Sequence, residues 1–380
     1  VVVFHLWPNR LTGGFAGVDV FFVISGFLIS GSLFNEIADR GSIRLASFWA
    51  KRIRRLLPAA LLVIGLTTIV AILVVPAFTR QTFFAEAIAS TFYFENWQLA
   101  ASATNYFAGE PSPFQHFWSL AVEEQFYLAW PLLLTGVAIF IRRRQQSAFK
   151  WFLAIAVLAS FAYSLFVSFS QPNLAYFTTF GRVWEFGLGA VIALLGHHIR
   201  LSNLGKALFS LGGFLAILWS ARFLNEGMAF PGWAALIPAI GTAAVILAGL
   251  QGLPTWLDRL YGFRPVAFTG EISYSLYLWH WPLIILLPWA TGYQPRAFEL
   301  IGLLAASYLL AFLSKKFVED RFRTLPALTK RKPRMTYALA AAASVIILAL
   351  SLVGSGVTSL QIAAQGQQTQ TLDRAKNDTA

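Results

Sequence analysis

The sequence predicts an all-α, polytopic membrane helix bundle, and three observations support this prediction. Hydrophobic residues make up 57% of the 380 residues, charged residues make up 12%, and the mean hydropathy is +0.63. An ordinary soluble chain carries roughly 25% charged residues, so most of this chain requires lipid as its solvent. The apolar residues also occur in runs of about 20, the length of a helix that crosses the hydrocarbon core.

The composition also excludes several classes of function. The chain has no cysteine, which excludes disulfides, thiolate metal sites and a cysteine nucleophile. A net charge of +12 would suggest nucleic-acid binding in a soluble protein. In a membrane protein it indicates basic cytoplasmic loops, so we expect no nucleic-acid partner. The histidines and acidic residues are too scattered in the sequence to predict a metal site.

Eleven segments are expected to form membrane helices, and the first of them is truncated by the start of the sequence. In chain order they are 1–7, 15–35, 57–76, 116–141, 151–168, 177–196, 205–223, 232–251, 266–289, 298–314 and 336–355. About ten of these form the predicted core bundle, and 336–355 is an extra C-terminal span. Segment 83–100 is also apolar, but it carries Glu86, Glu95 and Asn96, so we assign it to an external or re-entrant helix.

The loops between these segments differ strongly in charge, which predicts their sidedness. Of the 29 basic residues, 22 fall in one set of alternate loops, 6 fall in the other set, and Arg182 lies within a span. Basic loops face the cytoplasm, so the first set, which includes 142–144 and 330–332, is predicted to be cytoplasmic. The C-terminus is then extracytoplasmic.

Three parts follow from this organisation. Residues 1–325 form the predicted membrane domain, and residues 326–355 form a basic cytoplasmic loop with the extra transmembrane helix. Residues 356–380 are rich in Gln, Thr, Ser, Ala and Asp. This composition predicts a disordered extracytoplasmic linker.

Ionisable side chains within the spans are candidate functional residues, because they are costly in lipid unless they are paired or hydrated. The candidates are His5, Asp19, His116, Glu123, Glu124, Arg182, Glu185 and His280. All of them fall in the outer parts of their segments. We therefore expect them to lie at similar depth and to line one water-accessible cavity.

The charged candidates also have structural interpretations. Arg182 and Glu185 are three residues apart, which is compatible with an intrahelical ion pair. Asp19 near a helix start is favoured by the helix dipole. Glu123 and Glu124 are adjacent and point about 100° apart, so at most one of them should face a given cavity.

The three histidine candidates differ in how well a structural role explains them. His280 lies between two tryptophans and could belong to the aromatic belt at the membrane interface. His116 lies near a membrane boundary, where contact with water would be sufficient to explain a polar side chain. His5 is the hardest to explain structurally, because imidazole is the side chain best suited to proton transfer near neutral pH.

A basic cluster marks the cytoplasmic side. Lys51, Arg52, Arg54 and Arg55 fall within five residues just before Pro58, and Arg52 and Arg55 share a helix face. Paired guanidinium groups suit a phosphorylated ligand. The alternative is a cluster that binds anionic lipid headgroups.

Seven motifs occur in order along residues 1–325. They are His5-x-x-Pro8, Gly14-Phe15-x-Gly17-Val18-Asp19-x-Phe21-Phe22-x-Ile24-Ser25-Gly26-Phe27, Phe48-Trp49-x-x-Arg52-x-x-Arg55-Leu56-x-Pro58, His116-Phe117-Trp118-Ser119-Leu120-Ala121-Val122-Glu123-Glu124-Gln125-Phe126-Tyr127, Arg182-x-x-Glu185-Phe186, Ser273-Tyr274-Ser275-Leu276-Tyr277-Leu278-Trp279-His280-x-Pro282 and Val318-Glu319. This ordered set resembles the acyltransferase-3 family of integral membrane acyltransferases.

The resemblance implies an activity and a location. It implies transfer of an acyl group, usually acetyl, from cytosolic acyl-CoA (acetyl-CoA) to a hydroxyl of an extracytoplasmic or lipid-linked glycan, such as lipopolysaccharide or another cell-surface polysaccharide. The location implied is the bacterial inner membrane. The resemblance also implies that His5 is the essential catalytic residue and that Arg52 and Arg55 are required.

The resemblance further implies what adjoins this chain. An eleventh span is typical of members that continue into a periplasmic SGNH-type hydrolase-like domain. We therefore expect such a domain after residues 356–380 in the full-length protein. Family members usually carry an arginine about one helix length before the histidine, and this sequence begins after that position.

These inferences combine into one mechanistic hypothesis. Arg52 and Arg55 bind the phosphates of acyl-CoA, and His5 acts as general base or as nucleophile. Either Glu124 or Asp19 orients the imidazole.

The remaining candidates are assigned to the substrate site. Arg182 stabilises the developing oxyanion, and Glu185, His116 and His280 bind substrate. The competing hypothesis is a transporter or flippase of a sugar or lipid that uses the buried charges as a relay. A purely structural anchor would need only one span.

Overall fold

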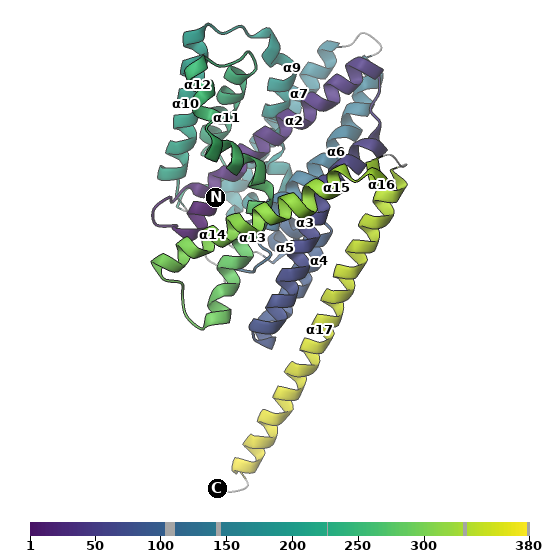
Figure 1. The fold of residues 1–380 in the computed structure, drawn as a ribbon, viewed down its shortest axis with the longest axis vertical. Helices are drawn as coiled ribbons and strands as arrows, with labels where there is room; N and C mark the ends of the chain where they lie inside the picture. The colour runs from purple at the N-terminus through teal and green to yellow at the C-terminus, as the bar shows by residue number, and fades with distance from the viewer. Residues whose placement is uncertain (103–110, 142–145, 226, 330–332, 378–380) are drawn as a thin grey trace. The chain divides into compact units, whose positions relative to one another are not determined.

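The computed structural model describes residues 1–102, 111–141, 146–225, 227–329 and 333–377. Regular secondary structure in these residues is entirely helical, which confirms the all-α prediction (Figure 1). Segments 142–144 and 330–332, which contributed to the predicted sidedness, lie outside the described residues.

The chain packs as two compact units that alternate along the sequence. Unit 1 comprises Val1–Trp49, Asn96–Glu110 and Trp118–Tyr274. Unit 2 comprises Ala50–Glu95, Pro111–Phe117 and Ser275–Ala380.

Unit 1 contains α1, α2 and the helices from α5 to α12. They are α1 (Val2–Leu6), the 3-10 turn η1 (Gly14–Ala16), α2 (Gly17–Arg40), α5 (Glu95–Ala101), α6 (Phe117–Ile141), α7 (Gln146–Ser170), α8 (Pro172–Phe177), η2 (Thr179–Gly181), α9 (Val183–Leu195), η3 (Gly196–His198), α10 (Asn203–Phe223), α11 (Leu236–Gly249) and α12 (Thr255–Tyr261).

The tightest packing in unit 1 is between α2 and α9, which lie against each other (Figure 1). A Cβ atom added to Gly26 would lie 2.1 Å from the Phe186 carbonyl oxygen. One added to Gly189 would lie 2.1 Å from the Val23 carbonyl oxygen. Because only glycine fits at these positions, the two backbones are in direct contact, as is common between membrane helices.

Unit 2 contains most of α3, α4, the second part of α13 and the C-terminal helices. Their bounds are α3 (Leu45–Val74), α4 (Ala77–Thr91), α13 (Arg264–Thr291), α14 (Ala297–Ser314), the π-helical turn η4 (Lys315–Glu319), α15 (Asp320–Thr324), α16 (Pro326–Thr329) and α17 (Arg334–Asn377).

Six helical segments of the described chain are long and apolar enough to cross a membrane. They are Gly14–Arg40, Leu45–Val74, Lys150–Ser170, Asn203–Phe223, Ala297–Thr329 and Arg334–Thr371. Each overlaps an expected span. α6 and α13 reach the expected lengths without being among the six, whereas α9 and α11 are 13 and 14 residues long. A polytopic helix bundle is thus confirmed, and the count of eleven spans stays a prediction.

The segment assigned to an external or re-entrant helix forms two short helices. α4 has 15 residues and α5 has 7. The backbone between them turns at Tyr93, whose φ is 56°. At 1.5 Å per residue α4 is about 22 Å long, too short to cross a hydrocarbon core of about 30 Å.

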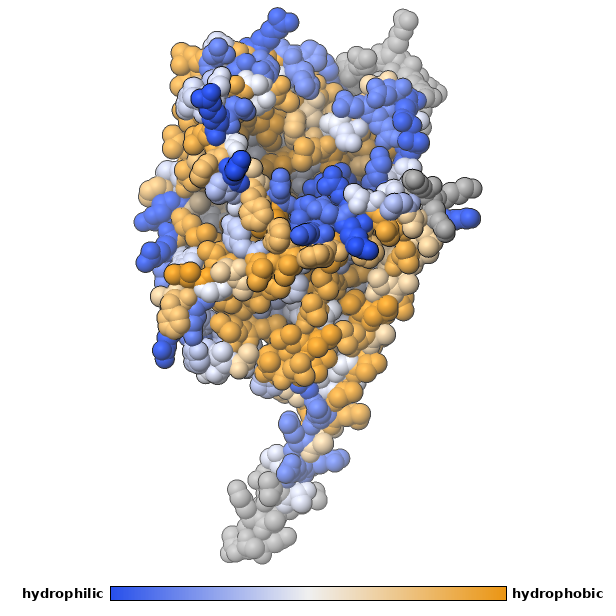
Figure 2. Space-filling view, in the orientation of Figure 1, coloured by the Kyte–Doolittle hydropathy of each residue, from blue (hydrophilic) through white to orange (hydrophobic). Residues whose placement is uncertain are grey.

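The C-terminal segment differs from the expectation of a disordered linker. α17 continues without a break to Asn377, so residues 356–377 are helical. Their Ala, Gln and Leu residues are good helix formers, and the apolar part of the same helix nucleates them. Figure 2 shows the change along α17 from apolar to polar side chains toward the C-terminus. The extracytoplasmic position of this segment stays a prediction.

Arg80 of α4 holds α17 within unit 2. Its side chain is buried, and its Nε donates to Thr358 Oγ1 at 3.0 Å. Its Nη2 donates to Gln361, and its Nη1 donates to the Ile72 carbonyl oxygen at 2.7 Å. These neutral acceptors satisfy a buried cation and attach α17 beyond its most apolar part.

Candidate functional site

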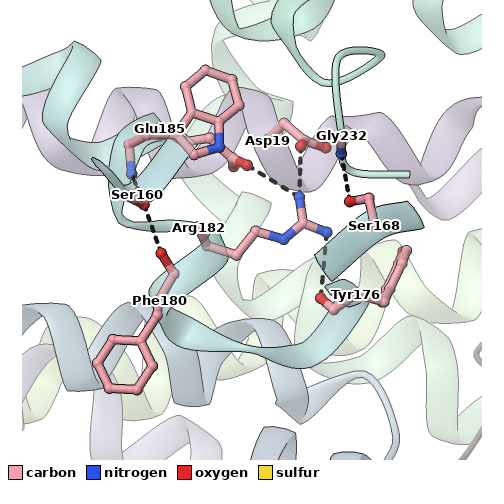
Figure 3. Close-up of polar contacts among 9 residues, drawn as sticks. Asp19, Ser160, Ser168, Tyr176, Phe180, Arg182, Glu185 and Gly232 are labelled. Carbon is pink, nitrogen blue, oxygen red and sulfur yellow. Dashed lines mark hydrogen bonds and ion pairs between the residues drawn. The ribbon is translucent and has the colours of Figure 1, made fainter. Parts of the chain in front are cut away.

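A buried arginine binds two carboxylates in unit 1 (Figure 3). Arg182 Nη1 donates to Asp19 Oδ1 at 2.8 Å and to Glu185 Oε1 at 3.1 Å. All three side chains are at most 1% exposed. The predicted pairing of Arg182 with Glu185 is therefore present, and Asp19 joins it from α2.

Aromatic rings surround the guanidinium group. Its Cζ lies 5.6 Å from the ring centre of Trp118, 5.4 Å from that of Tyr176 and 5.3 Å from that of Phe230. Its Nη2 also approaches the Tyr176 carbonyl oxygen at 3.4 Å. Cation–π contacts of this kind strengthen when water is excluded, so the rings stabilise the charge from the sides that carry no carboxylate.

The backbone around Arg182 departs from the single helix expected over 177–196. α8 ends at Phe177, the short turn η2 follows, and Arg182 is the N-cap of α9. Ser160 of α7 fixes this turn, because its Oγ donates to the Phe180 carbonyl oxygen at 2.6 Å and accepts from the Trp184 amide at 2.9 Å (Figure 3). The hydropathy of 177–196 did not indicate this break between α8 and α9, because hydropathy depends on residue type and not on backbone direction.

The cluster would carry a net negative charge if both carboxyl groups and the guanidinium were ionised. Two carboxylates face one guanidinium, and Asp19 Oδ2, Glu185 Oε2 and Arg182 Nε have no hydrogen-bond partner among the described residues. A buried unbalanced charge is costly. The cluster is neutral when the two carboxyl groups together hold one proton, as carboxylates that share a site commonly do.

Helix α1, which carries His5, packs against the same region. The His5 ring is half-buried and lies 5.1 Å from the Phe4 ring. Phe4 contacts Phe15 at 5.7 Å, and Phe15 contacts Phe230 at 4.7 Å, all between ring centres. Because Phe230 also covers the Arg182 guanidinium, α1 and the charged cluster belong to one packed part of unit 1.

A second buried network in unit 1 was not singled out from the sequence. Ser25 Oγ and Tyr127 Oη both donate to Glu123 Oε1, and Tyr127 Oη also lies 3.1 Å from Ser25 Oγ. The three residues are 5–6% exposed. Neighbouring Glu124 is half-buried, so Glu123 is the glutamate of this pair that faces α2. The signal was present in the motifs, which contain all three residues, but their contact depends on how α2 packs on α6.

Two histidines meet in unit 2. His116 and His280 are 2% and 0% exposed, and their ring centres lie 6.0 Å apart in an edge-to-face arrangement. His116 Nε2 bonds the Leu278 carbonyl oxygen at 3.2 Å, and His280 Nδ1 bonds that of Tyr277 at 2.7 Å. A carbonyl only accepts, so these nitrogens carry the protons. Both side chains are buried in protein, which argues against the hydrated boundary and aromatic-belt interpretations.

Unit 2 also contains a pair of carboxyl groups, Glu86 of α4 and Glu95 at the start of α5, outside the predicted spans. Glu95 is fully buried. Burial raises the pKa of Glu86 to about 7, against hydrogen bonds from Ser112 and Glu95 that lower it. Burial and the charge of Glu86 raise the pKa of Glu95 well above its ordinary value. Near neutral pH the pair therefore retains a proton.

The predicted phosphate-binding residues lie on α3 in unit 2. Arg52 is half-buried and Arg55 is exposed. Arg54, between them, donates from Nη1 to Thr336 Oγ1 of α17 at 3.2 Å. The basic cluster is thus part of a long helix and includes one residue that attaches α17.

The candidate residues therefore separate by unit. Unit 1 brings Asp19, Arg182 and Glu185 into contact and contains His5 and Glu124. Unit 2 brings His116 and His280 together and contains Arg52 and Arg55. Within the described ranges, no group of three or more His, Asp or Glu side chains is arranged to hold a metal ion.

The fold and these buried sites define a polytopic membrane protein with an ionisable interior, and comparison with known proteins identifies its family. The acyltransferase domain family, Acyl_transf_3, matches residues 1–316, so the chain belongs to this family. The chain is 31% identical to peptidoglycan O-acetyltransferase OatA of Listeria monocytogenes, with 97% of this chain and 63% of that protein covered. It is 32% identical to a Bacillus subtilis protein named "Putative peptidoglycan O-acetyltransferase YrhL", with 85% and 53% covered.

The chain therefore spans between half and two thirds of the length of these relatives. No solved structure matches it.

Proposed function

We propose that this chain is the membrane part of an O-acyltransferase that transfers an acyl group, usually acetyl, from cytosolic acyl-CoA to a hydroxyl of an extracytoplasmic glycan. Family membership over residues 1–316 is the observation that carries this proposal. The relatives named as peptidoglycan O-acetyltransferases favour peptidoglycan as the class of acceptor. A lipid-linked glycan and a following SGNH-like domain in the full-length protein belong to the same proposal, as does a bacterial inner-membrane location.

His5 is the proposed catalytic residue. A half-buried imidazole can take a proton from the acceptor hydroxyl near neutral pH, either as general base or after acting as nucleophile. The packing of Phe4 on Phe15 fixes the helix that carries it. General-base catalysis of this kind contributes roughly 10²–10⁴-fold to the rate.

The charged cluster has a positioning role in this proposal. Arg182 Nη1 is occupied by Asp19 and Glu185, so these three residues hold α2 against α9. Arg182 Nε and the second oxygens of both carboxyl groups remain for contacts with a bound group. Glu124 keeps its proposed role of orienting His5, and His116 and His280 keep theirs in binding substrate.

Acyl-CoA is the proposed donor, with its phosphates bound by Arg52 and Arg55. Charge-assisted hydrogen bonds are worth about 1.5–3 kcal/mol each. Removing both side chains should therefore weaken coenzyme A binding by roughly a hundredfold or more.

The experiment incubates membranes that contain the full-length protein with acetyl-labelled acetyl-CoA and cell-envelope glycans. We expect label on the glycan, its loss in His5→Gln, and its retention in the control His198→Gln, which alters an exposed histidine of η3. Coenzyme A binding should weaken in Arg52→Ala/Arg55→Ala but not in Arg40→Ala/Arg44→Ala. A wild-type protein that has no affinity for coenzyme A would refute the proposal and favour a transporter or flippase.

A further inference from the structure

The hydroxyl–carboxylate network of unit 1 has a chemistry that the proposed function does not use. Ser25 Oγ donates to Glu123 Oε1, and Tyr127 Oη donates to the same oxygen while lying 3.1 Å from Ser25 Oγ. A serine whose proton is directed at a carboxylate is placed as an activated nucleophile. The Tyr127 hydroxyl, which would remain beside the serine oxygen, can stabilise negative charge on it.

Two other buried serines of unit 1 have different partners among the described contacts. Ser30 lies on the same helix, and its Oγ accepts a hydrogen bond from Trp130 Nε1 at 2.8 Å. Ser160 donates to a backbone carbonyl. A hydroxyl that serves only to pack helices needs no titratable base, so the carboxylate distinguishes Ser25 from these residues.

The position of Ser25 along its helix is also informative. Ser25 lies eight residues after the start of α2, and Tyr127 lies ten residues after the start of α6. At 1.5 Å per residue these offsets are about 12 and 15 Å. The two residues thus lie at similar distances from the starts of their helices, within helical backbone rather than at helix ends.

A direct contact relates the network to the helix that carries the basic cluster. Trp49 Nε1 donates to the Tyr127 carbonyl oxygen at 3.0 Å. Trp49 lies three residues before Arg52 on α3, which is one helical turn.

We infer that Ser25 is the acyl-carrying nucleophile of this protein, with Glu123 as its base and Tyr127 as the hydroxyl that stabilises its oxygen. The inference rests on the proposed function, which requires an acyl group to pass from a cytosolic thioester to an extracytoplasmic acceptor. An ester on Ser25 divides this passage into two transfers. Exclusion of water by the surrounding protein protects the ester from hydrolysis.

In the first transfer, the Ser25 hydroxyl proton moves to Glu123 and Oγ forms a bond to the acyl carbon. The carbon–sulfur bond breaks, and the coenzyme A sulfur leaves with the proton from Glu123. The products are a serine ester and the free thiol of coenzyme A.

In the second transfer, the acceptor oxygen attacks the ester carbon and the bond to Ser25 Oγ breaks. The proton of the acceptor hydroxyl ends on Oγ. Ser25 thereby returns to its starting state.

The test uses full-length protein in lipid nanodiscs, acetyl-labelled acetyl-CoA without acceptor, an acid quench and mass spectrometry of the peptides. We expect label on the peptide that contains Ser25 in the wild-type protein and in the control Ser30→Ala, and no label in Ser25→Ala. Glu123→Gln keeps a hydrogen-bond acceptor but not the base. It should slow labelling by about 10²–10⁴-fold while coenzyme A binding stays within twofold.

A further variant guards against loss of folding. Ser25→Cys should carry the label as a thioester, which neutral hydroxylamine releases under conditions that leave the serine ester intact. The inference is overturned if wild-type protein releases coenzyme A without label on the Ser25 peptide, or if Ser25→Ala transfers acetyl to glycan at a rate within twofold of wild type. Either result leaves the proposed function standing, whereas wild-type protein that neither binds coenzyme A nor labels glycan contradicts both.

Discussion

The two units bury carboxyl groups in different ways. In unit 1, Asp19 and Glu185 meet a guanidinium that is itself surrounded by aromatic rings. In unit 2, Glu86 and Glu95 have each other, and a raised pKa keeps a proton between them. The first arrangement depends on a partner charge and the second depends on pH. Unit 1 should therefore be sensitive to loss of the partner charge, and unit 2 should be sensitive to pH. Three variants test this difference.

Removal of the partner charge should have the largest effect. Arg182→Ala leaves two buried carboxyl groups without their cation, and breaking a buried ion pair costs about 3–5 kcal/mol. We expect a corresponding fall in the thermal unfolding midpoint of the detergent-purified protein. Combining Asp19→Asn, Glu185→Gln and Arg182→Met should recover most of the loss, because no charge is then left buried. An Arg182→Ala midpoint equal to that of the wild type would show that the cluster does not stabilise unit 1.

Arg80 provides an intermediate case, since it is a buried cation with neutral partners. Arg80→Ala removes the hydrogen bonds to Thr358 and Gln361, and hydrogen bonds to charged groups are worth about 1.5–3 kcal/mol each. We expect faster amide hydrogen exchange in residues 356–371 of α17. Arg10→Ala, at an exposed position of unit 1, serves as the control. Unchanged exchange in the Arg80 variant would mean that α17 is held without this residue.

The carboxyl pair of unit 2 should give the smallest effect, and that effect should depend on pH. A carboxyl group with a raised folded-state pKa binds more protons in the folded protein, so stability falls as pH rises from about 4.5 to about 7. Glu86→Gln should therefore stabilise the protein on the order of 1 kcal/mol at pH 8 and have little effect at pH 4.5. Thermal unfolding at the two pH values measures this, with exposed Glu271→Gln as control. A gain of equal size at both values would contradict the shared proton.

Much of the fold follows from the sequence because hydropathy depends on local composition. Runs of about 20 apolar residues predicted helices such as Gly17–Arg40 and Asn203–Phe223. The acidic residues in 83–100 kept this segment from being counted as a span, and the structure divides it between α4 and α5. The sequence did not predict the break before α9 or the helical residues 356–377, because a chain reversal and a helix extended from an apolar segment leave no clear composition signal.

The candidate site was predictable in its members but not in its contacts. The cost of ionisable groups in lipid singled out Asp19, Arg182 and Glu185, and the structure joins them. It also gives Glu123 partners on α2 and α6, whereas the residues predicted to orient His5 are Glu124 or Asp19. Adjacent residues point in different directions on a helix, so the choice between them depends on which neighbour lies on each side.

The sequence by itself determined that the protein lies in lipid, that it is helical, and which of its ionisable residues are costly to bury. Each of these depends on residue type and local spacing. Only the tertiary structure decided which of those residues neutralise one another, since Asp19 meets Arg182 across 163 positions of the chain and Ser25 meets Glu123 across 98. Such contacts require the backbones of α2 and α9 to approach at Gly26 and Gly189 and the side chains of α6 to face α2. Packing between helices fixes that geometry, and no local pattern encodes it.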